Sequence, residues 1–211
     1  WHFEDSATEN VFGRYTSAGA MDLLTTGTPV TRVSNGYSEN GWDWSHLPGT
    51  TVAYLPLNIL ETGTMREMNG KSFLAVGSLD HNGVFGMDYK DFNSATGMTA
   101  LKSNFFFKDI ILCLGSDIQD TNGTFPIHTT LFQTALADTN TPTYVNGNSA
   151  TGTSFTITQT GGDFWATDAI GNGYVIPQNP SNTEAITVTR SAQISRNNAN
   201  TVNTTGNFAT A

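Results

Sequence analysis

The sequence predicts an all-β protein built from antiparallel strands, and three observations carry this prediction. Gly, Thr, Asn and Ser are plentiful while 13% of the residues are charged, which suits many short strands joined by tight turns. Asn-Gly pairs recur between apolar runs, and they favour hairpins because type I′ turns need two positive φ angles. Several runs alternate apolar residues with threonine. A length of 211 residues fits one large β domain as easily as two small ones.

The chain is organised around the aromatic segment, which we define as residues 40–51, NGWDWSHLPGTT. Trp42 and Trp44 are two residues apart, so on a strand their rings would share one face, and Pro48-Gly49 then predicts a turn. One interpretation is a buried aromatic corner that pins two strands. The other is a rigid rim, made by Trp42, Trp44 and His46, that binds a sugar or another flat ligand.

A second group of candidate binding residues lies near the start of the chain, where Glu9 and Asn10 are followed by Arg14 and Tyr15. A carboxylate, an amide, a guanidinium and a phenol this close together could converge on a ligand that carries a carboxylate, with Arg14 giving bidentate recognition. The ordinary alternative is a solvated loop with a weak Glu9–Arg14 ion pair.

The first half of the chain contains the strongest strand signals. Residues 52–55 are apolar on both faces and predict an interior strand that ends at Pro56. Residues 71–80 and 84–92 predict a hairpin joined at Asn82-Gly83, with Phe85, Met87 and Tyr89 on one face. The most apolar part of the chain predicts two strands at the centre of a sheet, residues 105–107 and 110–114, turning at Lys108-Asp109. In that run Cys113 is expected to be a small core residue.

The second half predicts shorter and more exposed strands. Residues 154–160 and 185–190 alternate apolar and polar side chains, as half-exposed antiparallel strands do. Residues 139–150 and 197–206 are polar and are expected to be loops. His128 is a single histidine in a strand-like run, and we expect it to be a structural residue whose hydrogen bonds are satisfied.

Charge and motif content exclude several classes of protein. A formal net charge of -9 argues against a nucleic-acid partner, since phosphate contacts need clustered Lys and Arg. No apolar run reaches membrane-spanning length, and a single cysteine forms no internal disulfide. We expect no cofactor apart from a candidate calcium ion at Asp80 and Asp88, which are as readily explained as turn formers. The start at Trp1 without a leader fits a cytosolic protein, a mature secreted protein or an excised fragment, whereas the ending NFATA, without a polar tail, favours a fragment.

Several blocks of the sequence together resemble one family, and they keep its order over most of the chain. The blocks are ENVFGRYTSAGAMDLL, GWDWSHLPGTT, SFLAVGSLDHNGVFGMDYK, LKSNFFFKDIILCLGSDI, HTTLFQTAL, GNGYVIP and GNFATA. They are similar to the central β domain of the family 8 polysaccharide lyases, in particular the broad-specificity chondroitin sulfate ABC lyases. The second and fourth blocks carry most of the resemblance.

The resemblance implies a large antiparallel multi-stranded β-sandwich of the supersandwich type, packed against an N-terminal α/α toroid that lies outside this chain. Such secreted or periplasmic bacterial enzymes cleave glycosaminoglycans by β-elimination at uronic acid. In the family the catalytic His, Tyr and Arg come from the toroid, and the β domain contributes a carboxylate in a Glu-Asn pair, matched here by Glu9 and Asn10. One departure is Ala7, where family members commonly carry Asn. Arg14 and Tyr15 match neighbouring family residues that have no assigned catalytic duty.

Three interpretations of the chain therefore stand. In the first, residues 1–211 are the central domain of a lyase for chondroitin sulfate, dermatan sulfate or hyaluronan, with a truncated C-terminal part and no activity alone. In the second, the chain is a non-catalytic carbohydrate-binding β-sandwich with Trp42 and Trp44 as its platform. In the third, it is a scaffold that binds no ligand.

Overall fold

The computed structural model describes residues 15–60, 70–91, 95–178, 184–196 and 204–211, and β-strands dominate these ranges. All pairings between the named strands are antiparallel, as predicted. The described helices are single turns: two 3-10 turns, Thr16–Ala18 and Val33–Asn35, and α1 (Leu57–Leu60). None of them has the length and hydropathy needed to cross a membrane.

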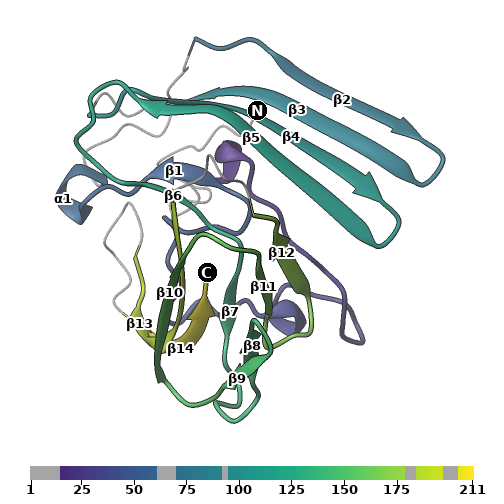
Figure 1. The fold of residues 1–211 in the computed structure, drawn as a ribbon, viewed down its shortest axis with the longest axis vertical. Helices are drawn as coiled ribbons and strands as arrows, with labels where there is room; N and C mark the ends of the chain where they lie inside the picture. Colours follow the sequence, from purple (N-terminus) through teal and green to yellow (C-terminus); the bar gives the residue numbers. More distant parts are fainter. Residues whose placement is uncertain (1–14, 61–69, 92–94, 179–183, 197–203) are drawn as a thin grey trace.

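A sheet of four long strands forms one end of the molecule and projects beyond the rest of it (Figure 1). Its strands follow the chain in order: β2 (Leu74–Leu79), β3 (Asn82–Lys90), β4 (Met98–Phe107) and β5 (Ile110–Asp120). The predicted turn at Lys108-Asp109 is confirmed, because Phe107 pairs with Ile110 across it. Hairpin connections of this kind need only local pairing, which is why the sequence predicts them well.

Two details of this sheet differ from the prediction. The β2–β3 hairpin exists, but Leu79 pairs with Asn82, so the turn residues are Asp80-His81 rather than Asn82-Gly83. Asp80 takes the positive φ of 52°, which an aspartate tolerates better than most residues do. The prediction that residues 110–114 lie at the centre of a sheet is wrong, because β5 pairs only with β4 in the described part of the sheet and forms an edge. Cys113 on this strand is exposed rather than buried in the core.

The other half of the molecule contains two further four-stranded sheets. One has the order β10 (Ser154–Thr160), β13 (Ala185–Ile194), β14 (Thr205–Thr210) and β7 (Gln133–Ala135). The other has the order β12 (Gly173–Ile176), β11 (Phe164–Thr167), β8 (Thr143–Val145) and β9 (Asn148–Ala150). The half-exposed strands predicted at residues 154–160 and 185–190 are thereby confirmed.

The loop predictions for this half need correction. Residues 139–150 contain the β8–β9 hairpin, whose turn at Asn146-Gly147 uses two positive φ angles, 47° and 85°. The expected loop at residues 197–206 lies mostly outside the described residues, and Thr205 and Gly206 belong to β14. The strand predicted from Val52 is the short β1 (Thr51–Ala53), which is fully buried but pairs only with β6 (Ile127–Thr129) among the described strands.

Two apolar cores hold the described elements together. The first lies between the inner face of β3 and β4 and the residues before β2, and includes Tyr15, Trp42, Val52 and Tyr89. The second lies among the strands of the C-terminal half and is centred on Phe132, Phe164 and Val188. Strand β14 joins them, because its neighbouring residues Phe208 and Ala209 point to opposite faces and enter different cores.

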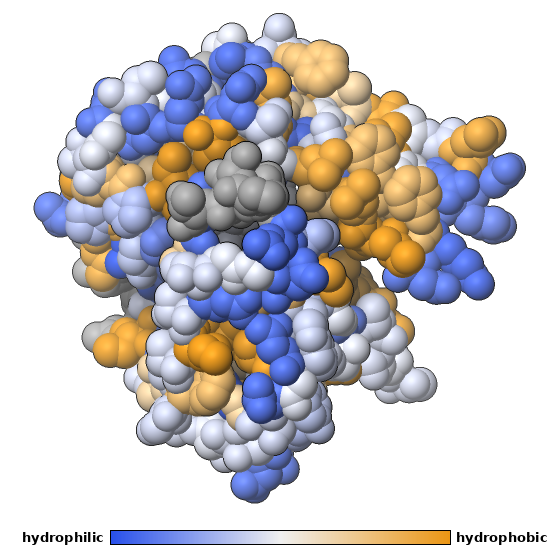
Figure 2. Space-filling model, in the orientation of Figure 1, coloured by the Kyte–Doolittle hydropathy of each residue, from blue (hydrophilic) through white to orange (hydrophobic). Residues whose placement is uncertain are grey.

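The opposite face of the long sheet, which we call the outer face, is apolar and uncovered in the described structure. The strand register places on it, in adjacent rows, exposed aliphatic and aromatic side chains of β3, β4 and β5: Val84, Leu101, Phe107, Ile110, Leu112 and Leu114. Figure 2 shows apolar side chains gathered over the region of this sheet. Soluble proteins rarely leave such a surface in water unless it meets another surface.

Candidate functional site

The predicted catalytic residues Glu9 and Asn10 lie outside the described residues, as does Arg14. Tyr15 is the first described residue, and its side chain is fully buried in the first core. Its hydroxyl donates a hydrogen bond to the carbonyl of Ala53 at 3.3 Å. The phenol is therefore held by the scaffold in this structure, and its predicted contact with substrate stays a prediction.

The residues that directly follow this predicted catalytic group are firmly attached to the β scaffold. The amide of Met21 donates to the carbonyl of Pro48 at 2.8 Å. From β4, the Lys102 ammonium donates to the carbonyls of Ala18, at 3.2 Å, and Gly49. Burial lowers the pKa of Lys102 to about 8. The loop at residues 16–19 and the Pro48-Gly49 turn are thus joined through one buried side chain.

Before Thr51, where β1 begins, the aromatic segment is a series of turns and not a strand, so the prediction that Trp42 and Trp44 share a strand face is wrong. The turn at Pro48-Gly49 is confirmed, with Gly49 at a φ of +82°. Trp42 is 2% exposed. Its ring packs edge-on against those of Tyr37 and Phe208, with ring centroids 4.9 and 5.9 Å apart. Trp44 is half-buried, and its ring lies 6.3 Å from that of Tyr37. This arrangement is the buried aromatic corner, and it leaves little of the Trp42 ring for a ligand.

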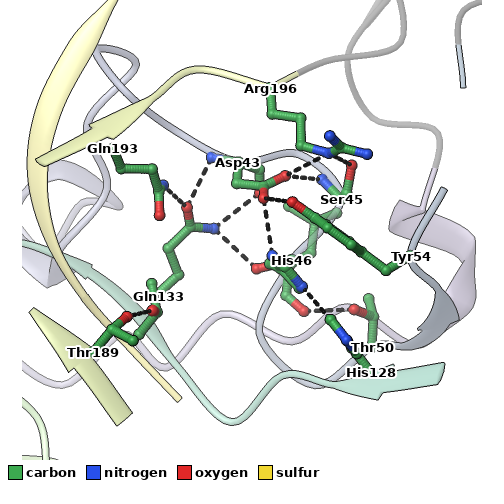
Figure 3. Close-up of polar contacts among 12 residues, drawn as sticks. Asp43, Ser45, His46, Thr50, Tyr54, His128, Gln133, Thr189, Gln193 and Arg196 are labelled. Carbon is green, nitrogen blue, oxygen red and sulfur yellow. Dashed lines mark hydrogen bonds and ion pairs between the residues drawn. The ribbon is translucent and has the colours of Figure 1, made fainter. Parts of the chain in front are cut away.

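Asp43, between the two tryptophans, is the centre of a polar cluster that sequence reasoning did not predict (Figure 3). The residue is 5% exposed. Its Oδ1 atom accepts a hydrogen bond from the amide of Ser45 at 2.7 Å. Oδ2 accepts from His46 Nδ1 at 2.9 Å and from the Tyr54 hydroxyl at 3.5 Å. Arg196 Nε lies 3.9 Å from Oδ1 and donates to Ser45 Oγ. A buried carboxylate needs this kind of compensation.

His46 extends the cluster to a second histidine, because its Nε2 lies 2.8 Å from Nδ1 of His128 on β6. The two rings are inclined by 7° and their centroids are 5.1 Å apart. This geometry describes two nearly coplanar rings joined edge to edge by a hydrogen bond, not two rings packed face on face. The sequence separates these histidines by 82 positions, which is why spacing did not reveal the pair.

Tyr54 and Arg196 form a stack over this histidine pair. The Tyr54 ring lies 4.4 Å from that of His46 and 4.9 Å from that of His128, nearly parallel to both. The Arg196 guanidinium lies 4.3 Å from the centre of the Tyr54 ring. Burial, followed by the negative charge of Asp43, raises the pKa of Tyr54 to about 12, so its phenol stays protonated. Burial and then His46 lower the pKa of His128 from its ordinary value.

Gln133 on β7 fixes the backbone beneath the cluster. Its amide oxygen accepts from the Asp43 amide at 2.8 Å and from Gln193 Nε2 at 2.7 Å. Its amide nitrogen donates to the carbonyls of Asp43 at 3.0 Å and His46 at 2.9 Å. All four hydrogen-bonding positions of one primary amide are thereby used.

The structure therefore adds residues that sequence reasoning did not select: Tyr54, Gln133, Arg196 and a site role for His128. The prediction that the hydrogen bonds of His128 are satisfied is confirmed for Nδ1, which pairs with His46, and not for Nε2, which has no partner among the described residues. The sequence signal that could have drawn attention to the cluster is the polar trio Asp43, Ser45 and His46 inside an apolar motif, since buried polar groups require partners.

The calcium prediction finds no support in the described part of the chain, where no group of three or more His, Cys, Asp or Glu side chains could hold a metal ion. Asp88 instead forms an ion pair with Lys71 at 2.8 Å. Asp80 occupies the β2–β3 turn.

A small pocket of about 60 Å³ lies next to the aromatic corner, lined in part by Tyr37, Trp42, Gln133 and Tyr174.

Comparison with known proteins identifies the family. The family model described as "Polysaccharide lyase family 8, super-sandwich domain" matches residues 2–211. The chain belongs to polysaccharide lyase family 8. Among curated proteins, the family 8 domain is 31% identical over 221 residues to a chondroitin sulfate ABC endolyase of Proteus vulgaris, covering 100% of this chain and 21% of that protein. It is 32% identical over 191 residues to a chondroitin sulfate ABC exolyase of Bacteroides thetaiotaomicron, covering 84% and 18%.

Solved structures agree with this assignment. The family 8 domain matches a Paenibacillus xanthan lyase with a TM-score of 0.53 and 25% identity, over 80% of this chain and 16% of that one. It matches a Streptomyces coelicolor chondroitin AC lyase with a TM-score of 0.50 and 20% identity, over 83% and 22%, which supports the fold alone. The chain spans about a fifth of the length of the curated relatives it matches.

These findings confirm the all-β fold of the supersandwich type and the predicted family. The individual roles predicted for Glu9, Asn10, Arg14, Tyr15, Trp42, Trp44 and His46 remain predictions.

Proposed function

We propose that this family 8 domain is the central β domain of an enzyme that cleaves chondroitin sulfate, dermatan sulfate or hyaluronan by β-elimination. In that reaction a base removes the C5 proton of the uronate, an acid protonates the leaving glycosidic oxygen, and a C4–C5 double bond forms. The observation that carries the proposal is the 31% identity, over the full chain, to a protein named chondroitin sulfate ABC endolyase. Secretion or export to the periplasm of a bacterium is part of the same proposal.

Within this enzyme the domain supplies support and not the reacting acid or base. Glu9, with Asn10, orients the catalytic arginine of an N-terminal α/α toroid and helps to hold the substrate. The attachment of the following residues supports this role: Tyr15, Met21 and Lys102 form hydrogen bonds that tie residues 15–21 to the scaffold. A group that acts by positioning another needs such a rigid base.

The charge of the chain also favours a partner domain. A net charge of -9 repels a polyanionic glycosaminoglycan, so the positive side of the substrate cleft has to come from elsewhere in the enzyme. The carbohydrate-binding alternative loses support from the burial of Trp42, because a stacking platform requires exposed rings.

A Glu9→Gln substitution in the full-length enzyme tests the proposal. We expect kcat on chondroitin sulfate to fall about 100-fold, because small displacements of an orienting group have effects of this size. The readout is the ultraviolet absorbance of the unsaturated uronate product. Glu39→Gln is the matched control, since Glu39 is exposed and lies in the same domain. Unchanged kinetics in Glu9→Gln would show that Glu9 does not orient the catalytic arginine.

The 211-residue chain alone provides the second test. We expect neither product formation nor tight, salt-sensitive binding of glycosaminoglycan. Turnover by this chain would show that it contains the base. Tight binding that weakens steeply with salt would contradict the assignment of the positive surface to another domain.

A further inference from the structure

Two hydrogen bonds join Asp43, His46 and His128 in series, and the chemistry of these groups determines which atom is the donor in each bond. An ionised carboxylate only accepts, so His46 Nδ1 carries the proton in its 2.9 Å bond to Asp43 Oδ2. In a neutral His46 the Nε2 atom then has a lone pair and accepts from Nδ1 of His128 at 2.8 Å. A neutral His128 that donates from Nδ1 carries a lone pair on Nε2.

The Nε2 atom of His128 is the last atom of this series of hydrogen bonds. Among the residues that the structure describes, this nitrogen has no hydrogen-bond partner. It is also not buried. His128 is partly exposed. The polar side chains around the ring make their contacts elsewhere in the cluster and not with this nitrogen. They are Asp43, His46, Tyr54 and Arg196.

We propose that His128 Nε2 contacts a hydroxyl group of the polysaccharide, and that Asp43 and His46 position this contact by fixing the tautomer of His128. The inference rests on the proposed function and deepens it by naming one contact between this domain and the substrate. A lone pair accepts a hydrogen bond from a sugar hydroxyl, whereas carboxylate and sulfate groups are themselves acceptors. The site therefore distinguishes the neutral hydroxyls of a glycosaminoglycan from its anionic groups.

The rigidity of the cluster gives the contact its precision. The Tyr54 ring covers both histidines and is itself covered by Arg196, so neither imidazole can rotate without breaking the stack. Gln133 holds the carbonyls of Asp43 and His46. A preorganised acceptor of this kind loses little entropy when it binds a ligand.

Two substitutions at His128 separate its two nitrogen atoms. In His128→Asn the amide nitrogen takes the place of Nδ1 and keeps the bond to His46, but no acceptor remains at the position of Nε2. In His128→Gln the amide reaches the position of Nε2 and offers an acceptor there. The measurement is the dissociation constant of a chondroitin oligosaccharide for the full-length protein, obtained by titration calorimetry.

We expect His128→Asn to weaken binding about fivefold, the effect of one lost hydrogen bond, and His128→Gln to stay within about twofold of the wild type. Wild-type affinity in His128→Asn, equal weakening in both variants, or a wild type that binds no oligosaccharide would each overturn the contact. Binding without formation of unsaturated product would refute the proposed function and leave the contact standing.

Nitrogen NMR of the wild type, with ¹⁵N-labelled histidine, keeps the inference testable if a variant fails to fold. We expect the Nε2 signal of His128 to report an unprotonated nitrogen at neutral pH and to shift when the oligosaccharide is added. A protonated Nε2, or a signal that the oligosaccharide leaves unchanged, would contradict the proposal.

Discussion

The long β2–β5 sheet and the aromatic segment are held in place by different interactions: backbone hydrogen bonds in the sheet and buried side chains in the segment. The sheet has long hydrogen-bonded ladders with one register shift between Thr99 and Leu101, yet it leaves Leu112 and Leu114 exposed. The aromatic segment has no strand between Gly41 and Thr50, yet Trp42, Asp43 and Ser45 are all buried. Regular backbone structure and burial are therefore separate properties in this molecule.

The difference shows where positional precision comes from. Backbone ladders join every strand of the sheet, and many of its outer side chains are exposed. In the aromatic segment, the side chains of Asp43 and Gln133 satisfy backbone groups that no ladder satisfies. Substitutions of side chains should consequently be costly in the segment and cheap on the outer face of the sheet.

The largest effect is expected from Asp43→Asn, which breaks the polar cluster. The amide group presents a donor to neighbours that need an acceptor, and it removes the charge opposite Arg196. We expect a loss of about 4 kcal/mol in unfolding free energy, measured by urea denaturation. Asp22→Asn is the control, because the Asp22–Arg32 pair is exposed and should contribute at most about 1 kcal/mol. Equal losses would mean that burial of the pair has no importance.

The second effect concerns Lys102, which links the sheet to the segment through the Gly49 carbonyl. Its pKa falls from 10.5 to about 8 on folding, so between these pH values the unfolded chain binds more protons than the native protein. Stability should therefore rise with pH across this window, by about 3 kcal/mol at 1.36 kcal/mol per unit. Lys102→Met should abolish this rise, which denaturation at pH 8 and pH 10.5 measures as a difference from the wild type. A parallel pH dependence in both proteins would exclude Lys102 as its source.

The smallest effect is expected on the outer face of the sheet. Leu112→Ser and Leu114→Ser should each lower the unfolding free energy of the 211-residue chain by no more than about 1 kcal/mol, because these residues are 47% and 51% exposed. They should also reduce the binding of a hydrophobic dye. The buried counterpart, Val188→Ala, should cost about 2 kcal/mol. A large loss from either serine variant would show that the face is covered.

Local pattern predicted the parts of the fold that depend on neighbouring residues. The β4–β5 turn at Lys108-Asp109 and strand β10 follow directly from alternation and turn chemistry. The β2–β3 turn was misplaced by two residues, because Asp80 accepts a positive φ that the pattern assigned to Asn82-Gly83. The short β8–β9 hairpin was missed, since its residues are too polar to give an apolar signal.

The candidate site was less predictable because its contacts join distant parts of the chain. Nothing near His46 in the sequence points to His128, and Arg196 reaches Asp43 from the opposite end of the domain. The family resemblance directed attention to Glu9 and Asn10, while the aromatic motif directed it to the tryptophans. The polar residues between those tryptophans indicate that partners are needed, but only the folded structure shows that His128 and Arg196 supply them.

The saturated amide of Gln133 has a consequence for how this domain can vary during evolution. Its oxygen and nitrogen serve Asp43, His46 and Gln193 at once, so a replacement that suits one neighbour deprives another. A glutamate would lose both donors, and a shorter asparagine would not reach. We therefore expect positions 133 and 193 to change together among natural relatives, as a linked pair inherited or lost as a unit.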